Sequence, residues 1–384
     1  MISAVRSFKI CWMVAQAGLL LALAAPLFSK PYRIYVGTYT RDKLSEGIYL
    51  ITFDPADGKA SEPVLAGKVA NPSFLTVHPN RKWLYSVSEE FSGPDAGTVT
   101  AFSIDPATGS LTALNTVKSK GSGPCYVSVD GTGKYVLVAN YGSGSIAALP
   151  IQADGKLGEA TSSVQHEGTG PNTNRQKGPH AHSIKQYPNT NFVIAADLGT
   201  DHLATYRFDA ASGKLTPAEP AKLAPGAGPR HFAFHPKKNV VYVNGEMGST
   251  VTAFEFNPKT GAWTTLGSVP TLPADYKGEN NTAEVVVHPS GKFVYCSNRG
   301  HDSLAIFTVD QAKGTLTPAG HVKTGGQIPR NFNIDPTGNY LLAANQRSND
   351  IHVFRIDTKT GQLTPTGQVL KVGSPVCLRF TPER

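Results

Sequence analysis

The chain has few cysteines, four among 384 residues. Cys11 lies in an apolar N-terminal segment, and Cys125, Cys296 and Cys377 are far apart in the sequence. This spacing matches neither a CxxC metal site nor a disulfide framework. We therefore expect the three later cysteines to be buried on strands, with at most one disulfide.

Charged residues are also scarce, at 17% of the chain, and long helical charge runs are absent. The formal net charge is +8, but no dense Lys/Arg block with interleaved aromatic residues occurs. The composition therefore argues against a nucleic-acid partner. A mildly basic surface instead fits an anionic small molecule, or simply solubility.

Only the N-terminus carries a long apolar run, residues 10–25, which follows two basic residues. Sixteen residues are short for a membrane span of about 20 residues. Small residues allow cleavage after Ala24, or up to Ser29, which is typical of a signal peptide. We expect residues 1–24 to be removed, and residues 30–384 to form one exported domain, periplasmic or secreted and without membrane attachment. A single membrane anchor is the alternative.

Signatures of metal, cofactor and serine-nucleophile chemistry are missing as well. No GxSxG motif and no convincing Ser-His-Asp set occur. His180 and His182, two residues apart, would face the same side of a regular strand. No third histidine and no acidic cluster accompany them, so no metal and no cofactor is expected.

Repeats and turn formers are what the chain has in abundance. It contains 38 glycines and 28 prolines. One phrase occurs seven times, as IYLITFDPADGKAS, VTAFSIDPATGSL, IAALPIQADGKL, LATYRFDAASGKL, VTAFEFNPKTGAW, LAIFTVDQAKGTL and IHVFRIDTKTGQL. Each copy indicates an apolar strand, a turn of Asp, Asn or Gly, and the start of another strand.

A second phrase alternates with the first, as in FLTVHPNRKWLYSVSEE and FAFHPKKNVVYVNGEM. Its seventh copy begins at Cys377 and is cut off by the chain end, while a matching strand stands at Tyr32–Thr40. The sequence therefore predicts an all-β, seven-bladed β-propeller with four-stranded blades, the last blade closed by strands from both termini. A pair of β-sandwiches would not explain a repeat divided between the termini.

Aligning the second phrase on its turn groups residues from different repeats. Six residues before the turn stand Ser73, Cys125, His182, Arg230, Ala283, Arg330 and Val376. Ten residues after it stand Glu89, Tyr141, Leu198, Glu246, Arg299 and Gln346. The first set begins the innermost strand, and the second ends the antiparallel strand that returns to the same face. Although polar residues at blade tips are ordinary, this combination predicts one shared site.

One repeat contains an insertion. A Gly/Asn-rich loop, His166–Gly178, precedes a lengthened segment that holds His180 and His182. A long loop on the face of a site is typical of a lid or a substrate clamp. A tolerated surface insertion is the alternative.

These motifs resemble the seven-bladed β-propeller lactonase family, which includes bacterial 6-phosphogluconolactonase and fungal carboxy-cis,cis-muconate cyclase. The resemblance covers essentially the whole chain after the N-terminal segment. The motifs that carry it are RQKGPHAHS, GPRHFAFHP, NGEMGS, NTAEVVVHPSGKFVYCSNRGHDSLAIF and PRNFNIDPTGNYLLAANQ. The resemblance implies that four residues are catalytic: His182, Arg230, Glu246 and Arg299. Four further residues in these motifs are expected to bind substrate: Arg175, His180, Glu284 and Arg330.

The implied activity is hydrolysis of a sugar-derived lactone by a monomeric, metal-independent, 6-phosphogluconolactonase-like enzyme with an anionic small-molecule substrate. Either Glu246 or His182 would be the general base. The predicted export signal argues against 6-phosphogluconolactone itself, because the family's sugar-phosphate enzyme works in the cytoplasm. A muconate-type lactonising cyclase and a non-catalytic propeller binding scaffold remain the alternatives.

Overall fold

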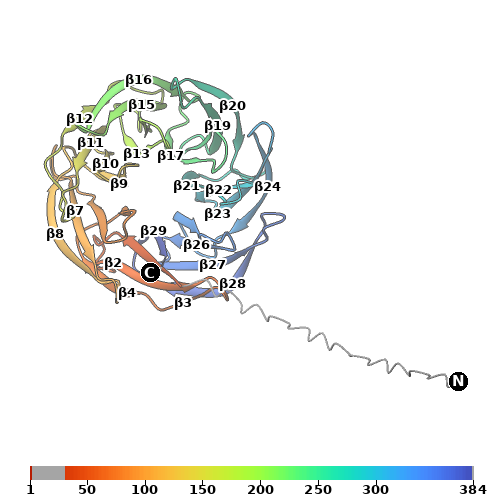
Figure 1. Cartoon of the computed structure of the whole chain (residues 1–384). Helices are drawn as coiled ribbons and strands as arrows, with labels where there is room; N and C mark the ends of the chain where they lie inside the picture. Colours follow the sequence, from red (N-terminus) through yellow and green to blue (C-terminus); the bar gives the residue numbers. More distant parts are fainter. Residues whose placement is uncertain (2–30, 383–384) are drawn as a thin grey trace.

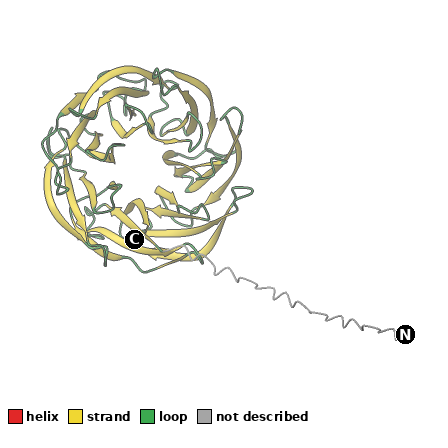
Figure 2. Cartoon of the chain, viewed as in Figure 1, coloured by secondary structure: helices red, strands yellow, loops and turns green. Residues whose placement is uncertain are grey.

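The computed structural model describes residue 1 and residues 31–382. The predicted signal peptide and its cleavage region fall within residues 2–30 and so lie outside the described residues. The described part is built of strands and turns and contains no helix (Figure 2). Consequently, it holds no helix long and apolar enough to cross a membrane.

Seven antiparallel sheets surround a central channel (Figure 1). Six blades follow one another in the chain, and in each the first strand lies at the channel and the fourth at the rim. The first three are β5 (Leu75–Val77), β6 (Trp83–Ser88), β7 (Thr98–Ile104) and β8 (Leu111–Lys118); β9 (Pro124–Val129), β10 (Tyr135–Asn140), β11 (Ser145–Pro150) and β12 (Ser162–Gln165); and β13 (Ala181–Gln186), β14 (Phe192–Asp197), β15 (His202–Asp209) and β16 (Lys214–Lys222).

The next three blades have the same order. They are β17 (Pro229–Phe234), β18 (Val240–Gly245), β19 (Thr250–Phe256) and β20 (Trp263–Pro270); β21 (Asn281–Val287), β22 (Phe293–Arg299), β23 (Ser303–Val309) and β24 (Leu316–Lys323); and β25 (Pro329–Ile334), β26 (Tyr340–Asn345), β27 (Asp350–Ile356) and β28 (Leu363–Lys371). The innermost strand of every blade begins at the same face of the ring, which we call the upper mouth of the channel.

Strands from both ends of the chain form the seventh blade. The C-terminal β29 (Pro375–Pro382) is innermost and pairs with β1 (Tyr32–Thr38), which pairs with β2 (Gly47–Asp54). The outer strand is divided into β3 (Lys59–Ala60) and β4 (Val64–Lys68), and both parts pair with β2. The predicted all-β, seven-bladed propeller closed by both termini is confirmed.

The predicted hairpin turns join the third and fourth strands of the blades. In one of them, Asp105 Oδ1 accepts the N–H groups of Ala107 and Thr108, at 2.9 and 2.7 Å. Gly109 then adopts φ 79°, and the equivalent Gly314 adopts φ 76°. Only glycine takes this left-handed conformation without strain, which explains why the phrase repeats glycine at this place.

Tyrosines on second strands connect neighbouring blades through these turns. The hydroxyl groups donate to glycine carbonyls of the next blade, in the pairs Tyr35–Gly109, Tyr85–Gly155, Tyr242–Gly314 and Tyr295–Gly361, at 2.8–3.1 Å. All four tyrosine rings are fully buried in the apolar layers between blades. Each bond therefore fixes one blade against the next where water cannot compete.

The three cysteines of the described chain agree with the prediction. Cys125, Cys296 and Cys377 are buried, free and located on β9, β22 and β29. Burial raises the pKa of each thiol. These thiols therefore remain protonated at neutral pH and have little nucleophilic character.

Candidate functional site

A cavity of about 270 Å³ lies at the upper mouth of the channel. It is lined by Glu89, Phe91, Cys125, Tyr141, Arg175, His182, Glu246, Asn281, Arg299 and Arg330. These side chains come from the starts of innermost strands, from the ends of second strands and from the inserted loop. The structure thus brings together residues that the repeat alignment grouped.

Glu246 is the anionic centre of this site. It follows β18, is 4% exposed and makes three ion pairs. Its Oε1 lies 2.8 Å from Arg175 Nη2, and its Oε2 lies 2.9 Å from Arg299 Nη2 and 3.0 Å from Arg230 Nε. Burial raises the pKa of a carboxyl group, but here the guanidinium charges outweigh it and hold the pKa of Glu246 far below its usual range.

Arg175 reaches the site from the inserted loop, His166–Gly178. Its Nη2 donates to the Tyr141 hydroxyl at 3.2 Å as well as to Glu246. The adjacent Gln176 is fully buried, and its Nε2 donates to a backbone carbonyl and to Asp201 Oδ1, both at 2.9 Å. The loop is therefore tied to its own blade, which fixes the position of Arg175.

His182 lies on β13 and is 5% exposed. Its Nδ1 is 3.6 Å from Cys125 Sγ, and its ring packs edge-on against Tyr141 and His231, with centroids 5.4 and 5.2 Å away. Burial, and then the charge of Arg230, lower the pKa of His182 well below 6.5. The imidazole is therefore neutral at pH 7 and can accept a proton.

Arg330 is the cation of the site with the least engaged side chain. Its guanidinium lies 5.5 Å from the Tyr39 ring centroid, and no carboxylate among the described residues forms an ion pair with it. The Tyr39 hydroxyl instead donates to both oxygens of Glu89, at 3.0 and 2.9 Å. The donors of Arg330 are therefore available to a ligand.

The charge of the site is strongly unbalanced. Arg175, Arg299 and Arg330 line the cavity with two carboxylates, Glu89 and Glu246. Arg230, which the resemblance assigns as catalytic, does not line it; this arginine is buried and pairs with Glu246. Planar guanidinium groups bind carboxylates and phosphates through paired hydrogen bonds. The cavity is consequently suited to an anionic ligand and to stabilising an oxyanion.

Two residues expected to bind substrate do not line this cavity. His180 stacks on Tyr141, with centroids 4.6 Å apart, and its Nδ1 lies 2.9 Å from the Tyr141 carbonyl. Glu284 lies deeper in the channel, where it contacts His231. In the part of the chain that the structure describes, no group of three or more His, Cys, Asp or Glu side chains is arranged to hold a metal ion.

The site also contains residues that the sequence did not single out as functional. Glu89 and Tyr141 occupy the same repeat position as Glu246. The repeat alignment therefore already placed both residues at the site. Tyr39 follows β1 as Glu246 follows β18. Extending the alignment into the repeat divided between the termini would have found it.

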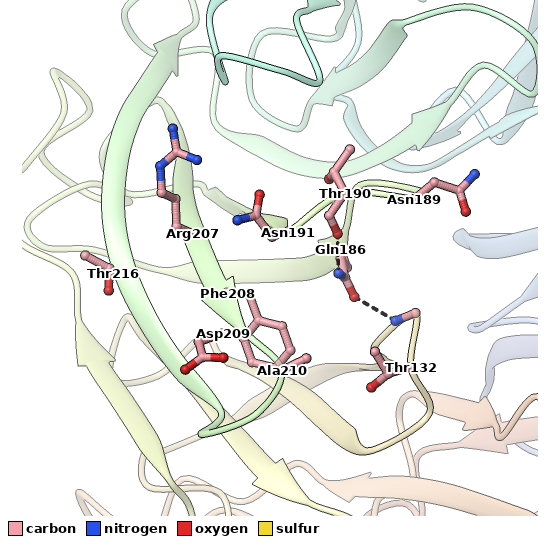
Figure 3. A pocket seen from close by; sticks show the side chains of 11 residues that line it. Thr132, Gln186, Asn189, Thr190, Asn191, Arg207, Phe208, Asp209, Ala210 and Thr216 are labelled. Carbon is pink, nitrogen blue, oxygen red and sulfur yellow. Dashed lines mark hydrogen bonds between the residues drawn. The ribbon is translucent and has the colours of Figure 1, made fainter.

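A larger cavity, of about 660 Å³, lies on the opposite face among the turns of two blades (Figure 3). Gln186 bridges these turns by accepting the Gly131 N–H and donating to the Thr190 carbonyl. The one cation there, Arg207, stacks on Phe192 at 4.8 Å, and Asp209 accepts from the Ser212 hydroxyl. No charged groups converge in this cavity, so size alone does not make it the candidate site.

Comparison with known proteins identifies the class that this fold and site define. The family described as Lactonase, 7-bladed beta-propeller matches residues 33–380. A 6-phosphogluconolactonase of Bacillus subtilis is 42% identical over 301 residues, which cover 78% of this chain and 84% of that protein. The chain belongs to this lactonase family, which confirms the predicted resemblance and the predicted enzyme class, a lactone hydrolase.

Solved structures agree over nearly the full ring. A putative 6-phosphogluconolactonase from Bacteroides fragilis is 37% identical, with a TM-score of 0.86, covering 93% of this chain and 99% of that one. The periplasmic gluconolactonase of Pseudomonas aeruginosa is 33% identical, with a TM-score of 0.87, covering 92% of this chain and all of that one.

Proposed function

We propose that this protein is an exported, metal-independent lactonase that hydrolyses a sugar-derived aldonolactone. The surplus of guanidinium groups around a neutral, buried histidine carries the proposal. Support for export comes from the predicted signal peptide and from the similarity to a protein named as a periplasmic gluconolactonase. An exported enzyme would encounter aldonolactones outside the cytoplasm, where sugar phosphates are not formed.

Hydrolysis requires water to attack the lactone carbonyl and the ring C–O bond to break. In the proposed reaction, His182 accepts the proton of the attacking water. Arg299 and Arg330 stabilise the oxyanion that develops on the carbonyl oxygen. The protonated His182 then gives its proton to the leaving alkoxide, and the product is an open hydroxy acid.

Glu246 has a different role in this proposal. A carboxylate that is held by three arginines and has a depressed pKa is a weak proton acceptor. It is instead suited to orienting Arg175, Arg230 and Arg299 around the substrate. The negative charge that develops on the substrate oxyanion offsets the arginine charges and so raises the pKa of His182, which favours proton transfer from water to the imidazole.

The test is turnover of gluconolactone, other aldonolactones and their phosphorylated forms by the mature protein in the presence of a chelator. We expect His182→Gln to lower kcat about 10²–10⁴-fold, the usual range for loss of a general base, with little change in KM. Glu246→Gln should raise KM and leave residual turnover, because it disorders the arginines. A Lys214→Gln variant on the exposed strand β16 is the matched control.

Four outcomes would contradict the proposal. Complete loss of activity in Glu246→Gln, with activity retained in His182→Gln, would make Glu246 the base. Loss of turnover with the chelator would reject metal independence. Turnover of unsaturated dicarboxylates alone would favour a lactonising cyclase, and no turnover at all would favour a binding scaffold.

A further inference from the structure

The central channel is divided by a layer of side chains. Five residues before the turn of each repeat stand Phe74, Tyr126, Ser183, His231, Glu284, Asn331 and Cys377. Phe74 and Tyr126 stack with ring centroids 3.9 Å apart, and His231 packs edge-on against both, at 5.6 and 5.2 Å. This middle layer lies directly below the candidate site, because His182 packs on His231.

The Glu284 carboxylate finds its partners within the middle layer and its own backbone. Glu284 Oε1 lies 2.9 Å from His231 Nδ1 and also accepts the Val285 N–H at 3.1 Å. Glu284 Oε2 accepts from Asn331 Nδ2 at 2.5 Å. Both carboxylate oxygens are therefore engaged within the layer, although Glu284 also borders the space beneath it.

Beneath the middle layer lies a second cavity, of about 440 Å³, which we call the lower cavity. It shares no lining residue with the cavity at the upper mouth. Its wall includes the residue three before the turn in every repeat: Thr76, Ser128, Lys185, Ala233, Val286, Asn333 and Arg379. Two cations from different blades thus face one cavity.

Both cations keep donors that the protein does not use. The Lys185 ammonium group donates to the Phe232 carbonyl and lies 4.5 Å from that residue's ring centroid. Arg379 donates from Nε to the Leu75 carbonyl at 3.0 Å and from Nη1 to a carbonyl at 2.9 Å. An ammonium group has three donors and a guanidinium five. Within residues 31–382, Arg379 Nη2 has no hydrogen-bond partner and neither cation forms an ion pair.

The lower cavity keeps an excess of positive groups, because Lys185 and Arg379 face it together with a single carboxyl group, that of Glu284. Burial lowers the pKa of Lys185 to about 8, against the opposing effect of Glu284, so the lysine is still cationic at neutral pH. Lys185 and Arg379 are both partly buried, and a bound anion would offset the cost of removing their charges from water. The Ser128 hydroxyl is already used by the Ile184 carbonyl, which leaves the two cations as the principal ligand donors.

We infer that the lower cavity is a second anion-binding site, which takes a small phosphate or carboxylate between Lys185 and Arg379. This site is separate from the lactone site, because residues of the middle layer lie between the two cavities and the cavities share no lining residue. The anion accepts hydrogen bonds from the ammonium group and from Arg379 Nη2. Inorganic phosphate and malonate, a short dicarboxylate, are the probes that show whether the site prefers a phosphate or a carboxylate ligand.

Calorimetric titration of the full-length protein in phosphate-free buffer tests the inference. We expect two equivalents of anion to bind to the wild-type protein. Arg330→Gln should weaken only the equivalent in the upper cavity. Lys185→Gln and Arg379→Gln should each weaken only the other equivalent, by about tenfold or more, which is typical for loss of a charged hydrogen bond. Lys214→Gln, on an exposed strand, is the matched control and should bind as the wild type does.

A single equivalent in the wild-type protein, removed by Arg330→Gln, would overturn the inference. Unchanged binding in both Lys185→Gln and Arg379→Gln would also overturn it, provided that circular dichroism shows both to be folded. If these variants do not fold, wild-type crystals soaked in tungstate decide the matter. Tungstate density between Lys185 and Arg379 supports the site, and its absence there rejects it. Lactone turnover is not a readout, so the result is independent of the proposed function.

Discussion

At the scale of single residues, the site shows how neighbours set the chemistry of a side chain. Glu246 is as buried as His182, yet its arginine partners hold it ionised, whereas burial and the charge of Arg230 hold His182 neutral. The two candidates for the general base therefore differ in protonation although they line one cavity. This difference leads to a pH dependence that separates them.

We expect the acid limb of the pH profile of kcat/KM to lie below pH 6.5, the ordinary pKa of histidine. The reason is that His182 must be neutral to act, and its lowered pKa keeps it neutral to lower pH. The charge of Glu246 raises the pKa of His182, so Glu246→Gln should move the limb further down. Initial rates between pH 4 and 8 give the acid limb of the wild-type protein and that of Glu246→Gln. A wild-type limb at or above pH 6.5 would contradict the assignment of His182 as the general base.

At the scale of elements, buried tyrosine hydroxyls form hydrogen bonds that hold neighbouring blades together. Tyr295 on β22 donates to the Gly361 carbonyl at 2.8 Å, in the turn between β27 and β28. The ring is fully buried, so no water can replace the hydroxyl. The same arrangement at three other blade boundaries explains why tyrosine recurs on second strands.

Tyr295→Phe should destabilise the protein by about 1–3 kcal/mol, because the Gly361 carbonyl is left buried without its partner. Tyr276→Phe is the matched control, since its hydroxyl bond to the Glu279 carbonyl is at the surface. That change should cost no more than about 0.5 kcal/mol. Denaturant midpoints of the two variants give the comparison, and equal losses would reject a special role for the buried bonds.

At the scale of the whole molecule, stability depends on closing the ring. β29 and β1 pair in antiparallel register from Tyr32 opposite Pro382 to Thr38 opposite Pro375. The Leu378 N–H also donates to Asn331 Oδ1 on the neighbouring blade, at 2.8 Å. β29 thus joins the last blade both to the N-terminal strand and to the blade before it.

Deleting residues 375–384 should abolish cooperative unfolding near the wild-type temperature and cause aggregation. The deletion removes the innermost strand of the seventh blade and exposes the edge of β1. Thermal unfolding and light scattering would report this. A circular permutant that joins the termini and opens between β8 and β9 keeps every strand and should fold. A truncated protein that stays monomeric and fully stable would contradict the closure argument.

Much of the fold was predictable because strand, turn and strand alternate with a constant period. The glycine turns and the blade divided between the termini both followed from that period. The convergence of His182, Arg230 and Glu246 followed as well, since antiparallel strands return to the same face. None of these inferences required a distance.

The direction in which individual side chains point, toward the cavity or away from it, was not predictable in the same way. The register of the innermost strands shifts next to the site, between Ala181 and Ser183 and between Thr282 and Val285. Such bulges break the alternation of side chains along a strand. Glu284 therefore belongs to the middle layer, and His180 stacks outside the cavity. Tyr39 escaped notice because its repeat is divided between the termini.

The sequence by itself determined the number of blades, their closure and that His182, Glu246 and Arg299 lie at the upper mouth, because repeat spacing fixes strand position. Only the tertiary structure decided that Glu246 is held by three arginines, that His182 is neutral and that a middle layer separates two cavities. These properties depend on burial and on contacts between different blades. The spacing of residues along the sequence specifies neither the burial of a side chain nor its contacts.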